Sequence, residues 1–243
     1  MIERVYKKLR GSAILYDATR VEDPEPELFD PACWRASGEV EGSGDRGRGE
    51  ALFVRHGDAQ WVLRHYRRGG QAAKVSGDRY LWLGAKRTRS VAEWRLLEWL
   101  THHDLPVPHP IAAWYRRRGL LYTADILIER IDPARSLTQA LATGGVSEAE
   151  WHAIGACIRR FHSEGAYHAD LNADNVLFGA DNEVVLIDWD RGRLLEPSPV
   201  WQQSNLDRLL RSLVKRADTI AEVEFDGSEW EYLVAGYEEQ VRA

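Results

Sequence analysis

The order of the hydrophobic patterns constrains the fold more than any other feature of this chain. Up to about residue 132, short strand-type stretches alternate with glycine-rich or charged turns, and helix-type patterns dominate after it. A sheet with one helix, followed by a mainly helical half, predicts an α+β fold of two lobes that share a cleft. We place the joint within residues 128–131, so the predicted lobes are residues 1–130 and 131–243.

The first half has the pattern of a small antiparallel sheet. Residues 60–66 read as one strand, and residues 111–115 and 120–128 read as two more. A helix is expected between them, opening at Ser90 to Glu93, which has the form of a capping box. Residues 1–30 are polar, and their proline-containing stretch predicts a turn or extended chain.

The second half is dominated by helical periodicity. A second capping box at residues 147–150 opens a helix that should end near Gly165. A short β region is expected over residues 175–187, and two helical patterns close the chain around residues 206–214 and 230–237.

Composition excludes several classes of protein. A chain of 243 residues can bury the core of two lobes, and a net charge of −6 gives no support for a nucleic-acid binder. Cys33 and Cys157 lie far apart without a metal-ligand spacing, which predicts reduced thiols and no zinc site. Residues 1–8 have no apolar region of the signal-peptide type, and no apolar run approaches the roughly 18 residues of a membrane span.

Residues 168–175 have the pattern H-x-D-L-x-x-x-N, which is typical of the catalytic loop of kinase-like enzymes. Phosphoryl transfer requires a carboxylate that accepts the proton of the acceptor hydroxyl, here Asp170, and an amide oxygen that coordinates Mg²⁺, here Asn175. His168 is expected to bond the backbone near the metal turn rather than to act as a base. The alternative is an ordinary polar turn, because Asp and Asn favour turns.

A second motif lies thirteen positions after Asn175, where Asp188 follows the apolar strand 184–187. Kinase-like enzymes carry a metal-binding aspartate at such a strand end, so Asp188 is predicted to hold Mg²⁺ against the phosphates of ATP. Asp190 stands where these enzymes have glycine, and aspartate tolerates positive φ better than most residues. Asp190 is therefore either a turn residue or a second carboxylate near the metal; Asp188 could also be an ordinary strand-end aspartate.

The nucleotide-covering parts are less well defined in the sequence. Gly42, Gly44 and Gly47 lie between strand-like stretches, where either a phosphate-covering loop or a surface hairpin is expected, and their spacing is not G-x-G-x-x-G. Glu129 and Arg130 follow the apolar run at the predicted joint, where adenine would bond main-chain atoms. These residues are the candidate nucleotide contacts of the first lobe.

Arg64 occupies the strand position at which kinases have a lysine, and arginine can clamp a phosphate or a carboxylate with two hydrogen bonds. Two interpretations of it stay open: an ion pair with Glu93, or a solvent-facing side chain. Glu93 likewise either pairs with Arg64 or reaches back to cap Ser90.

Only 55 residues follow Asp188 and no A-P-E motif appears, which leaves little room for a peptide platform and favours a small-molecule, sugar or lipid-linked acceptor. Across most of its length the chain resembles the 3-deoxy-D-manno-octulosonic acid (Kdo) kinases of the lipopolysaccharide-core kinase family. The segments that carry the resemblance are residues 62–70, 87–89, 105–108, 167–172, 186–192 and 204–213, together with Glu93. The family favours Phe where this chain has Trp189.

The resemblance implies a protein-kinase-like fold and ATP-dependent phosphorylation of the Kdo sugar on a lipid A precursor, at the cytoplasmic face of the inner membrane of a Gram-negative bacterium. It gives Asp170 the role of base and assigns Mg²⁺ to Asn175 and Asp188. It also pairs Arg64 with Glu93, and lets residues 42–49 cover the phosphates. The basic clusters at residues 64–68, 86–89 and 116–118 are then either solvated faces or a surface for anionic lipid or substrate.

Two other functions remain open from the sequence. One is a small-molecule phosphotransferase of the antibiotic-modifying type on the same fold. The other is a pseudokinase or nucleotide-binding scaffold without catalysis. The acceptor, the membrane-contact surface and the oligomeric state do not follow from the motifs.

Overall fold

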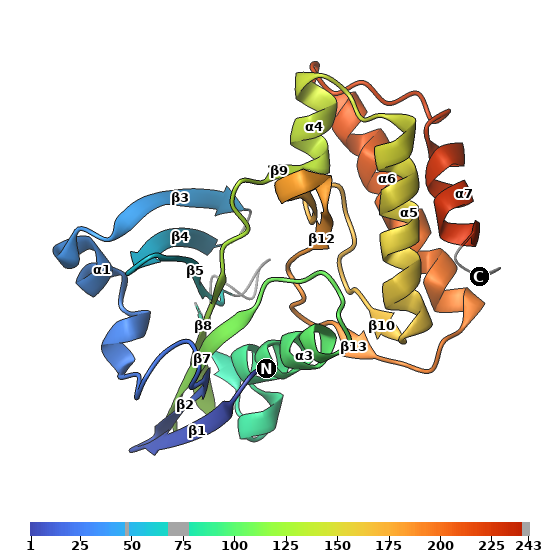
Figure 1. Cartoon of the computed structure of the whole chain (residues 1–243). Helices are drawn as coiled ribbons and strands as arrows, with labels where there is room; N and C mark the ends of the chain where they lie inside the picture. The colour runs from blue at the N-terminus through green and yellow to red at the C-terminus, as the bar shows by residue number, and fades with distance from the viewer. Residues whose placement is uncertain (47–48, 68–77, 240–243) are drawn as a thin grey trace. The chain divides into compact units, whose positions relative to one another are not determined.

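The computed structural model describes residues 1–46, 49–67 and 78–239 (Figure 1). Two compact units make up the chain, one of residues 1–99 and 108–130 and the other of residues 100–107 and 131–243. The sequence placed residues 100–107 in the first lobe, whereas here they cluster with the second unit. Each unit is described by itself below.

The first unit is built on one antiparallel sheet, in which the strands follow the order β1-β2-β7-β8-β5-β4-β3 and β6 pairs with β8. The strands are β1 (Arg4–Leu9), β2 (Ser12–Asp17), β3 (Val40–Arg46), β4 (Gly49–His56), β5 (Ala59–His65), β6 (Tyr80–Leu81), β7 (Pro110–Arg118) and β8 (Leu121–Glu129). The long hairpin β7–β8 is central, and both of its strands are almost fully buried at their apolar positions. The predicted strands over residues 60–66, 111–115 and 120–128 are therefore present.

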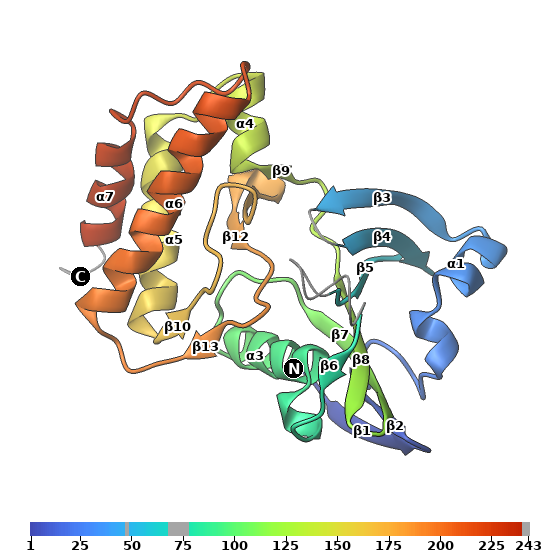
Figure 2. The ribbon, with the colours of Figure 1, turned by 180° about the vertical axis from the view of Figure 1, so that it is seen from behind.

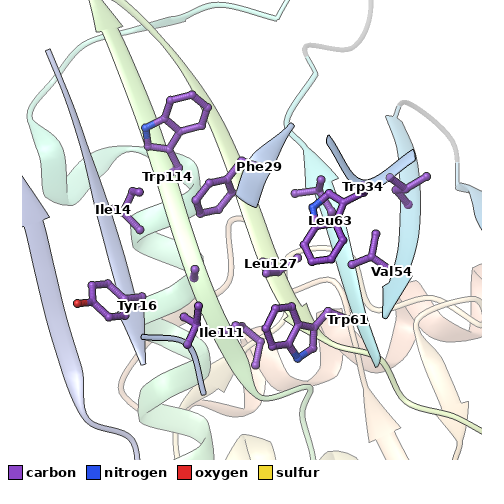
Figure 3. Packing of buried hydrophobic residues seen from close by; sticks show 13 residues of the cluster. Ile14, Tyr16, Phe29, Trp34, Val54, Trp61, Leu63, Ile111, Trp114 and Leu127 are labelled. Carbon is purple, nitrogen blue, oxygen red and sulfur yellow. The ribbon is translucent and has the colours of Figure 1, made fainter. Parts of the chain in front are cut away.

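The first 30 residues are more regular than the sequence predicted. β1 and β2 form a hairpin in which Tyr6 lies opposite Leu15, and the short helices η1 (Pro26–Phe29) and α1 (Pro31–Ser37) follow. Phe29 and Trp34 are buried in the cluster of large side chains that Figure 3 shows. Trp34 lies edge-on to Trp61 of β5, with ring centroids 6.4 Å apart. The prolines of this segment start helices instead of only breaking strands.

The helix predicted from Ser90 begins one residue earlier, at Arg89. It is α3 (Arg89–His102), whose last three residues belong to the second unit, and the short η2 (Ala85–Arg87) precedes it. Ser90 lies inside the first turn, and its hydroxyl donates to the carbonyl of Trp114 at 2.8 Å. The capping-box interpretation of Ser90 and Glu93 is therefore wrong, because Ser90 is not in the position of an N-cap.

The second unit is mainly helical (Figure 2). Its helices are η3 (Ala180–Asn182), α4 (Leu137–Thr143), α5 (Glu148–Ser163), α6 (Pro199–Thr219) and α7 (Trp230–Glu239). Its strands are β9 (Arg135–Ser136), β10 (Ala166–Tyr167), β11 (Val176–Phe178), β12 (Val184–Leu186) and β13 (Arg193–Leu194). None of the helices in the described residues is long and apolar enough to span a bilayer.

Local chemistry explains the edges of the helices in this unit. Ser147 and Glu150 form the predicted capping box of α5, and Ser136 and Gln139 form a second one on α4 that the sequence analysis did not identify. Helices α5 and α7 approach so closely at Gly155 that a Cβ atom there would lie 1.9 Å from the carbonyl oxygen of Leu233. Only glycine allows this approach, so α5 forms a fixed base for the loops that follow it.

Candidate active site

The two predicted metal ligands lie at one end of the same β-hairpin. Strands β11 and β12 are antiparallel, with Val176 opposite Leu186. Asn175 directly precedes β11 and Asp188 follows β12 by two positions, and the Ile187 amide donates to the Asn175 carbonyl at 3.0 Å. A spacing of thirteen residues in the sequence therefore becomes neighbouring strand ends in the fold.

The amide of Asn175 is oriented by the loop that it closes. Its Nδ2 donates to the main-chain carbonyl of Asp170 at 2.9 Å, and Nδ2 of Asn172 donates to the same carbonyl at 3.0 Å. Because the nitrogen of the Asn175 amide is used in this way, its Oδ1 is the atom left to coordinate a cation. Asn175 is buried, so its orientation is set by the protein and not by solvent.

His168 connects the loop to the end of the hairpin. Its Nε2 donates to the carbonyl of Ile187 at 2.9 Å, and its Nδ1 accepts from the Asp170 amide at 3.1 Å. This pair of bonds requires a neutral imidazole with the proton on Nε2. Burial lowers the pKa of His168, which keeps the ring neutral. These contacts hold the main chain on either side of the site.

Asp188 has a strained main chain. Its φ is +62°, a left-handed conformation that is unusual outside glycine. Next to it, Trp189 is buried, donates from Nε1 to the Leu186 carbonyl at 3.0 Å and stacks on Phe161 with ring centroids 5.0 Å apart. Packing of the indole thus fixes the strained residue, a common feature of functional sites.

Asp190 does not have the positive φ that the comparison with a glycine suggested. Left-handed conformations occur instead at Asp188 and Arg191, on either side of it. Asp190 is half-buried and belongs to the turn that follows β12. The bend that kinases make with a glycine is made here by two other residues.

One face of helix α6 holds the catalytic loop, and the sequence analysis did not assign it this role. Asn205 accepts from the His168 amide at 3.2 Å and donates to the His168 carbonyl at 2.9 Å, so it bonds both main-chain polar groups of that residue. Ser212 accepts from the Ala173 amide at 2.8 Å, and Arg216 pairs with Asp174. The signal was present in the sequence as polar residues at positions 205, 208, 212 and 216, which are three or four apart and so lie on one helix face.

Asp170 lies at the open side of the loop. Its side chain is 60% exposed, and Nη1 of Arg208, also on α6, lies 3.1 Å from its Oδ1. An ion pair this exposed stabilises the fold little. Its position is the important point, because a carboxylate reachable from solvent can meet an incoming hydroxyl, and Arg208 lies next to any acceptor group that binds there.

The first unit contains the predicted pair of Arg64 and Glu93. Nη2 of Arg64 on β5 lies 2.5 Å from Oε1 of Glu93 on α3, and the Tyr66 hydroxyl donates to Oε2 at 2.5 Å. The Glu93 side chain is 1% exposed, so donors such as Arg64 and Tyr66 stabilise its charge. Arg64 is accordingly not a solvent-facing side chain.

The glycines are part of a hairpin. Gly42 and Gly44 lie within β3, beside the ring of Phe53 on β4, and a Cβ atom on Gly44 would lie 3.0 Å from that ring. Gly47 lies outside the described residues. The contact with Phe53 gives a structural reason for Gly44 and leaves the phosphate-covering role of the β3–β4 hairpin a prediction.

Glu129 is the last residue of strand β8, and Arg130 follows it. The Glu129 amide donates to the His109 carbonyl at 2.8 Å, and the Arg130 amide donates to the Gln60 carbonyl at 2.9 Å. Their side chains form ion pairs with Arg20 and Glu41, respectively, both at 3.0 Å. A base that bonds the main chain of these two residues would therefore use their carbonyl oxygens.

A model of the lipopolysaccharide kinase (Kdo/WaaP) family matches residues 31–237, which include every candidate residue above. The chain belongs to that family. The membership and the kinase class predicted from the sequence are confirmed, and a kinase of this family uses ATP. The match supports neither the antibiotic-type phosphotransferase nor the pseudokinase.

Curated relatives agree with the family model. The chain is 49% identical to a 3-deoxy-D-manno-octulosonic acid kinase of Stenotrophomonas maltophilia (strain R551-3) over 203 residues, which cover 84% of this chain and 80% of the relative. It is 48% identical to the enzyme of that name from Xanthomonas axonopodis pv. citri, over 86% of this chain and 84% of the relative. For the Xylella fastidiosa (strain 9a5c) enzyme the identity is 47%, with 85% and 82% covered.

Proposed function

We propose that this protein transfers the γ-phosphoryl group of ATP to a hydroxyl of the Kdo sugar on a lipid A precursor, a step of lipopolysaccharide core biosynthesis. The observation that carries the proposal is the arrangement of Asp170, Asn175 and Asp188 around one loop and one hairpin end, in a chain whose relatives are named Kdo kinases. The proposed fold is of the protein-kinase type, with lobes of residues 1–130 and 131–243.

Asp170 is the proposed base. The acceptor oxygen attacks the γ-phosphorus as the bond to the β,γ-bridging oxygen breaks, and the hydroxyl proton moves to the Asp170 carboxylate. His168 keeps the Asp170 main chain in place through the bond to its amide. Both products, ADP and the phosphorylated sugar, then leave, and the carboxylate returns its proton to solvent.

The donor atoms at the hairpin end suit Mg²⁺. Asn175 offers an amide oxygen and Asp188 a carboxylate, the oxygen ligands that this ion prefers. In the described part of the chain, no three His, Cys, Asp or Glu side chains gather in the manner of an all-protein metal centre. For an ion that enters with the nucleotide, the expected ligands are two protein side chains and phosphate oxygens. The bound ion would neutralise the charge of the phosphates.

The first unit supplies the proposed nucleotide contacts. Arg64, held by Glu93, presents a fixed positive charge to the phosphates, as the strand lysine does in kinases. Gly42 and Gly44, with Gly47, would cover the phosphates from the β3–β4 hairpin. The carbonyls of Glu129 and Arg130 would accept from the adenine amino group.

The acceptor determines where the enzyme works. A lipid A precursor is anchored in a bilayer, so we propose a peripheral location on the cytoplasmic face of the inner membrane. No nucleic acid is needed as a partner, in keeping with the net charge of −6.

An acceptor assay tests the proposal. The wild type is incubated with γ-labelled ATP and either a Kdo-bearing lipid A precursor or an aminoglycoside, with D170A as the inactive control. We expect label only in the Kdo-bearing lipid and none with D170A. Label in the aminoglycoside alone would establish the antibiotic-type alternative. A Mg²⁺-ATP-dependent rise in thermal stability with no transfer to either acceptor would establish a nucleotide-binding scaffold.

A further inference from the structure

Three segments that are distant in the sequence meet at one corner of the sheet in the first unit. The Arg117 amide donates to the Gly11 carbonyl at 2.8 Å, and the Trp82 amide donates to the Leu120 carbonyl at 2.9 Å. Strand β6 pairs Leu81 with Leu121 of β8. We call residues 8–12, 80–87 and 114–121 the basic corner; in Figure 2 it lies where β6 and the β1–β2 hairpin meet β7 and β8.

The basic corner exposes leucines. Leu81, Leu83 and Leu120 are 56%, 61% and 74% exposed, and they are the three most exposed leucines among the described residues. Leu120 is at the tip of the β7–β8 turn, and Leu81 and Leu83 flank Trp82, which bonds that turn. Leucines exposed at turns do not contribute buried apolar area to the fold. Exposed apolar side chains that lie close together indicate an interaction surface.

Positive charge surrounds these leucines. The basic corner holds Lys8, Arg10, Lys86, Arg87 and the three arginines 116–118, and no aspartate or glutamate, although the whole chain has a net charge of −6. In the described part of the chain, no ion pair links any of these seven residues to a carboxylate. Their charge is therefore available to a partner.

Aromatic rings hold two of these arginines at the surface. Arg116 lies over the ring of Trp114 and Arg117 over the ring of Trp82, each 4.9 Å from the ring centroid. Beside them is a hollow of about 250 Å³, lined among others by Trp82, Tyr115 and Lys8. A half-exposed tryptophan, Trp82, beside exposed arginines and leucines is typical of a protein surface at the membrane–water interface.

We infer that the basic corner is the surface on which this enzyme docks to an anionic phospholipid bilayer. Arginines and lysines meet the lipid phosphates while the leucine tips enter the headgroup region. A second copy of the chain fits less well, because seven cations would face seven more without carboxylates to oppose them. Nucleic acid would leave the leucines uncovered. The inference rests on the proposed function only in that a membrane-anchored acceptor requires an enzyme that reaches the membrane.

Vesicle binding tests the inference without any catalytic step. The full chain is sedimented with phosphatidylcholine vesicles and with vesicles that also contain phosphatidylglycerol, in the absence of ATP and acceptor. We expect binding only to the anionic vesicles, with weakening as salt rises. L120E and R118E should each lower the partition coefficient on the order of tenfold.

Two control variants make the same kinds of substitution outside the basic corner: glutamate replaces an exposed apolar residue in one and an exposed cation in the other. V200E alters a side chain that is 82% exposed at the start of α6, and K215E reverses an exposed charge on the same helix. Both should bind the anionic vesicles as the wild type does. Equal binding by L120E and the wild type, or equal losses in the control variants, would overturn the assignment of the surface.

The activity of the same variants separates this inference from the proposed function. L120E and R118E should phosphorylate a deacylated, water-soluble Kdo-bearing saccharide at the wild-type rate and a vesicle-borne acceptor more slowly. A wild type that transfers phosphate but binds no vesicles would refute the membrane surface and leave the kinase. A wild type that binds vesicles through this corner but transfers nothing would refute the kinase alone. A dimer that L120E dissociates, without vesicle binding, would identify a self-association surface instead.

Discussion

The imidazole of His168 donates from Nε2 to the carbonyl of Ile187, 2.9 Å away, and so ties the catalytic loop to the strand end that precedes Asp188. The same ring accepts from the Asp170 amide at 3.1 Å. One side chain therefore bonds the main chain of the proposed base, Asp170, and the main chain next to the proposed metal ligand, Asp188. This relationship gives His168 a structural reason to stand in the loop, apart from any contact with substrate.

H168A removes both bonds and leaves a part-buried carbonyl and a part-buried amide without this partner, a cost of about 1–3 kcal/mol in the free energy of unfolding. We expect a lower Tm and a lower kcat, with a smaller change in KM for ATP. Denaturant unfolding and steady-state kinetics measure both effects. H152A, which alters a half-exposed histidine on α5, is the control. Equal effects of the two substitutions would contradict the positioning role.

Asp170 should be required for transfer and not for nucleotide binding. D170N keeps the shape of the side chain and removes the proton acceptor, so kcat should fall by roughly 10²–10⁴. The affinity for Mg²⁺-ATP, measured by calorimetry, should be unchanged. D218N on the exposed face of α6 serves as the control. Transfer by D170N at near the wild-type rate would refute the assignment of the base.

Substitution of Asp188 should affect the stability of the fold and the binding of Mg²⁺-ATP in different ways. Its φ of +62° suits glycine, so D188G should not destabilise the fold. In D188A the Cβ atom makes the same positive φ unfavourable, so this variant should be less stable than D188G. Both variants lose the carboxylate and should lose the Mg²⁺-dependent part of ATP binding. Thermal unfolding with and without Mg²⁺-ATP measures both properties. A D188G protein that is still stabilised by Mg²⁺-ATP as the wild type is would exclude Asp188 as a ligand.

The Arg64–Glu93 pair should tolerate some exchanges and not others. R64A leaves the buried carboxylate of Glu93 with one donor fewer, which should cost about 1–3 kcal/mol of stability and raise KM for ATP. R64K keeps a cation within reach of Glu93 and should lose less of both. Y66F removes another donor to the same carboxylate and tests stability without changing the charge of either partner. An R64A protein with unchanged KM would leave the pair a structural one.

Sequence reasoning succeeded where a pattern is local and long. The strands around residues 60–66 and 120–128 and the helix after Ser147 have clear periods and capping signals, and they are present. The hairpin of residues 4–17 was missed because β1 is an edge strand in which Arg4, Lys7 and Lys8 are charged, so it resembles a polar segment. Helix α1 is only seven residues long and gives little periodicity.

The motif residues of the candidate site could be predicted from the sequence, but the residues that hold the loop in place could not. Asp170, Asn175 and Asp188 stand out because phosphoryl transfer needs those residue types in that order. The contacts of Asn205 and Ser212 with the loop depend on where α6 packs, which no local pattern specifies. The competing role of Glu93 was decided by the hydroxyl of Ser90, which bonds a strand carbonyl instead of capping its helix.

The last prediction concerns pH. Burial lowers the pKa of His162 to about 4, from 6.5 for an exposed histidine, and its ring bonds the Tyr237 hydroxyl at 2.8 Å. Below pH 6.5 the His162 imidazole is protonated in the unfolded chain but stays neutral in the folded chain. Its contribution to folding stability is therefore fully present above that pH and is lost as pH falls toward 4. A shift of this size corresponds to about 3 kcal/mol. The buried His168, whose pKa is also lowered, adds in the same direction.

Thermal unfolding between pH 7 and pH 4.5 measures this effect. The wild type should lose stability steeply over that range, and H162Q, which keeps a hydrogen-bonding side chain but cannot titrate, should lose less. H152A alters a half-exposed histidine beside Glu239 and should keep the wild-type slope. A slope for H162Q as steep as that of the wild type would show that carboxylates, and not this buried ring, govern the acid instability.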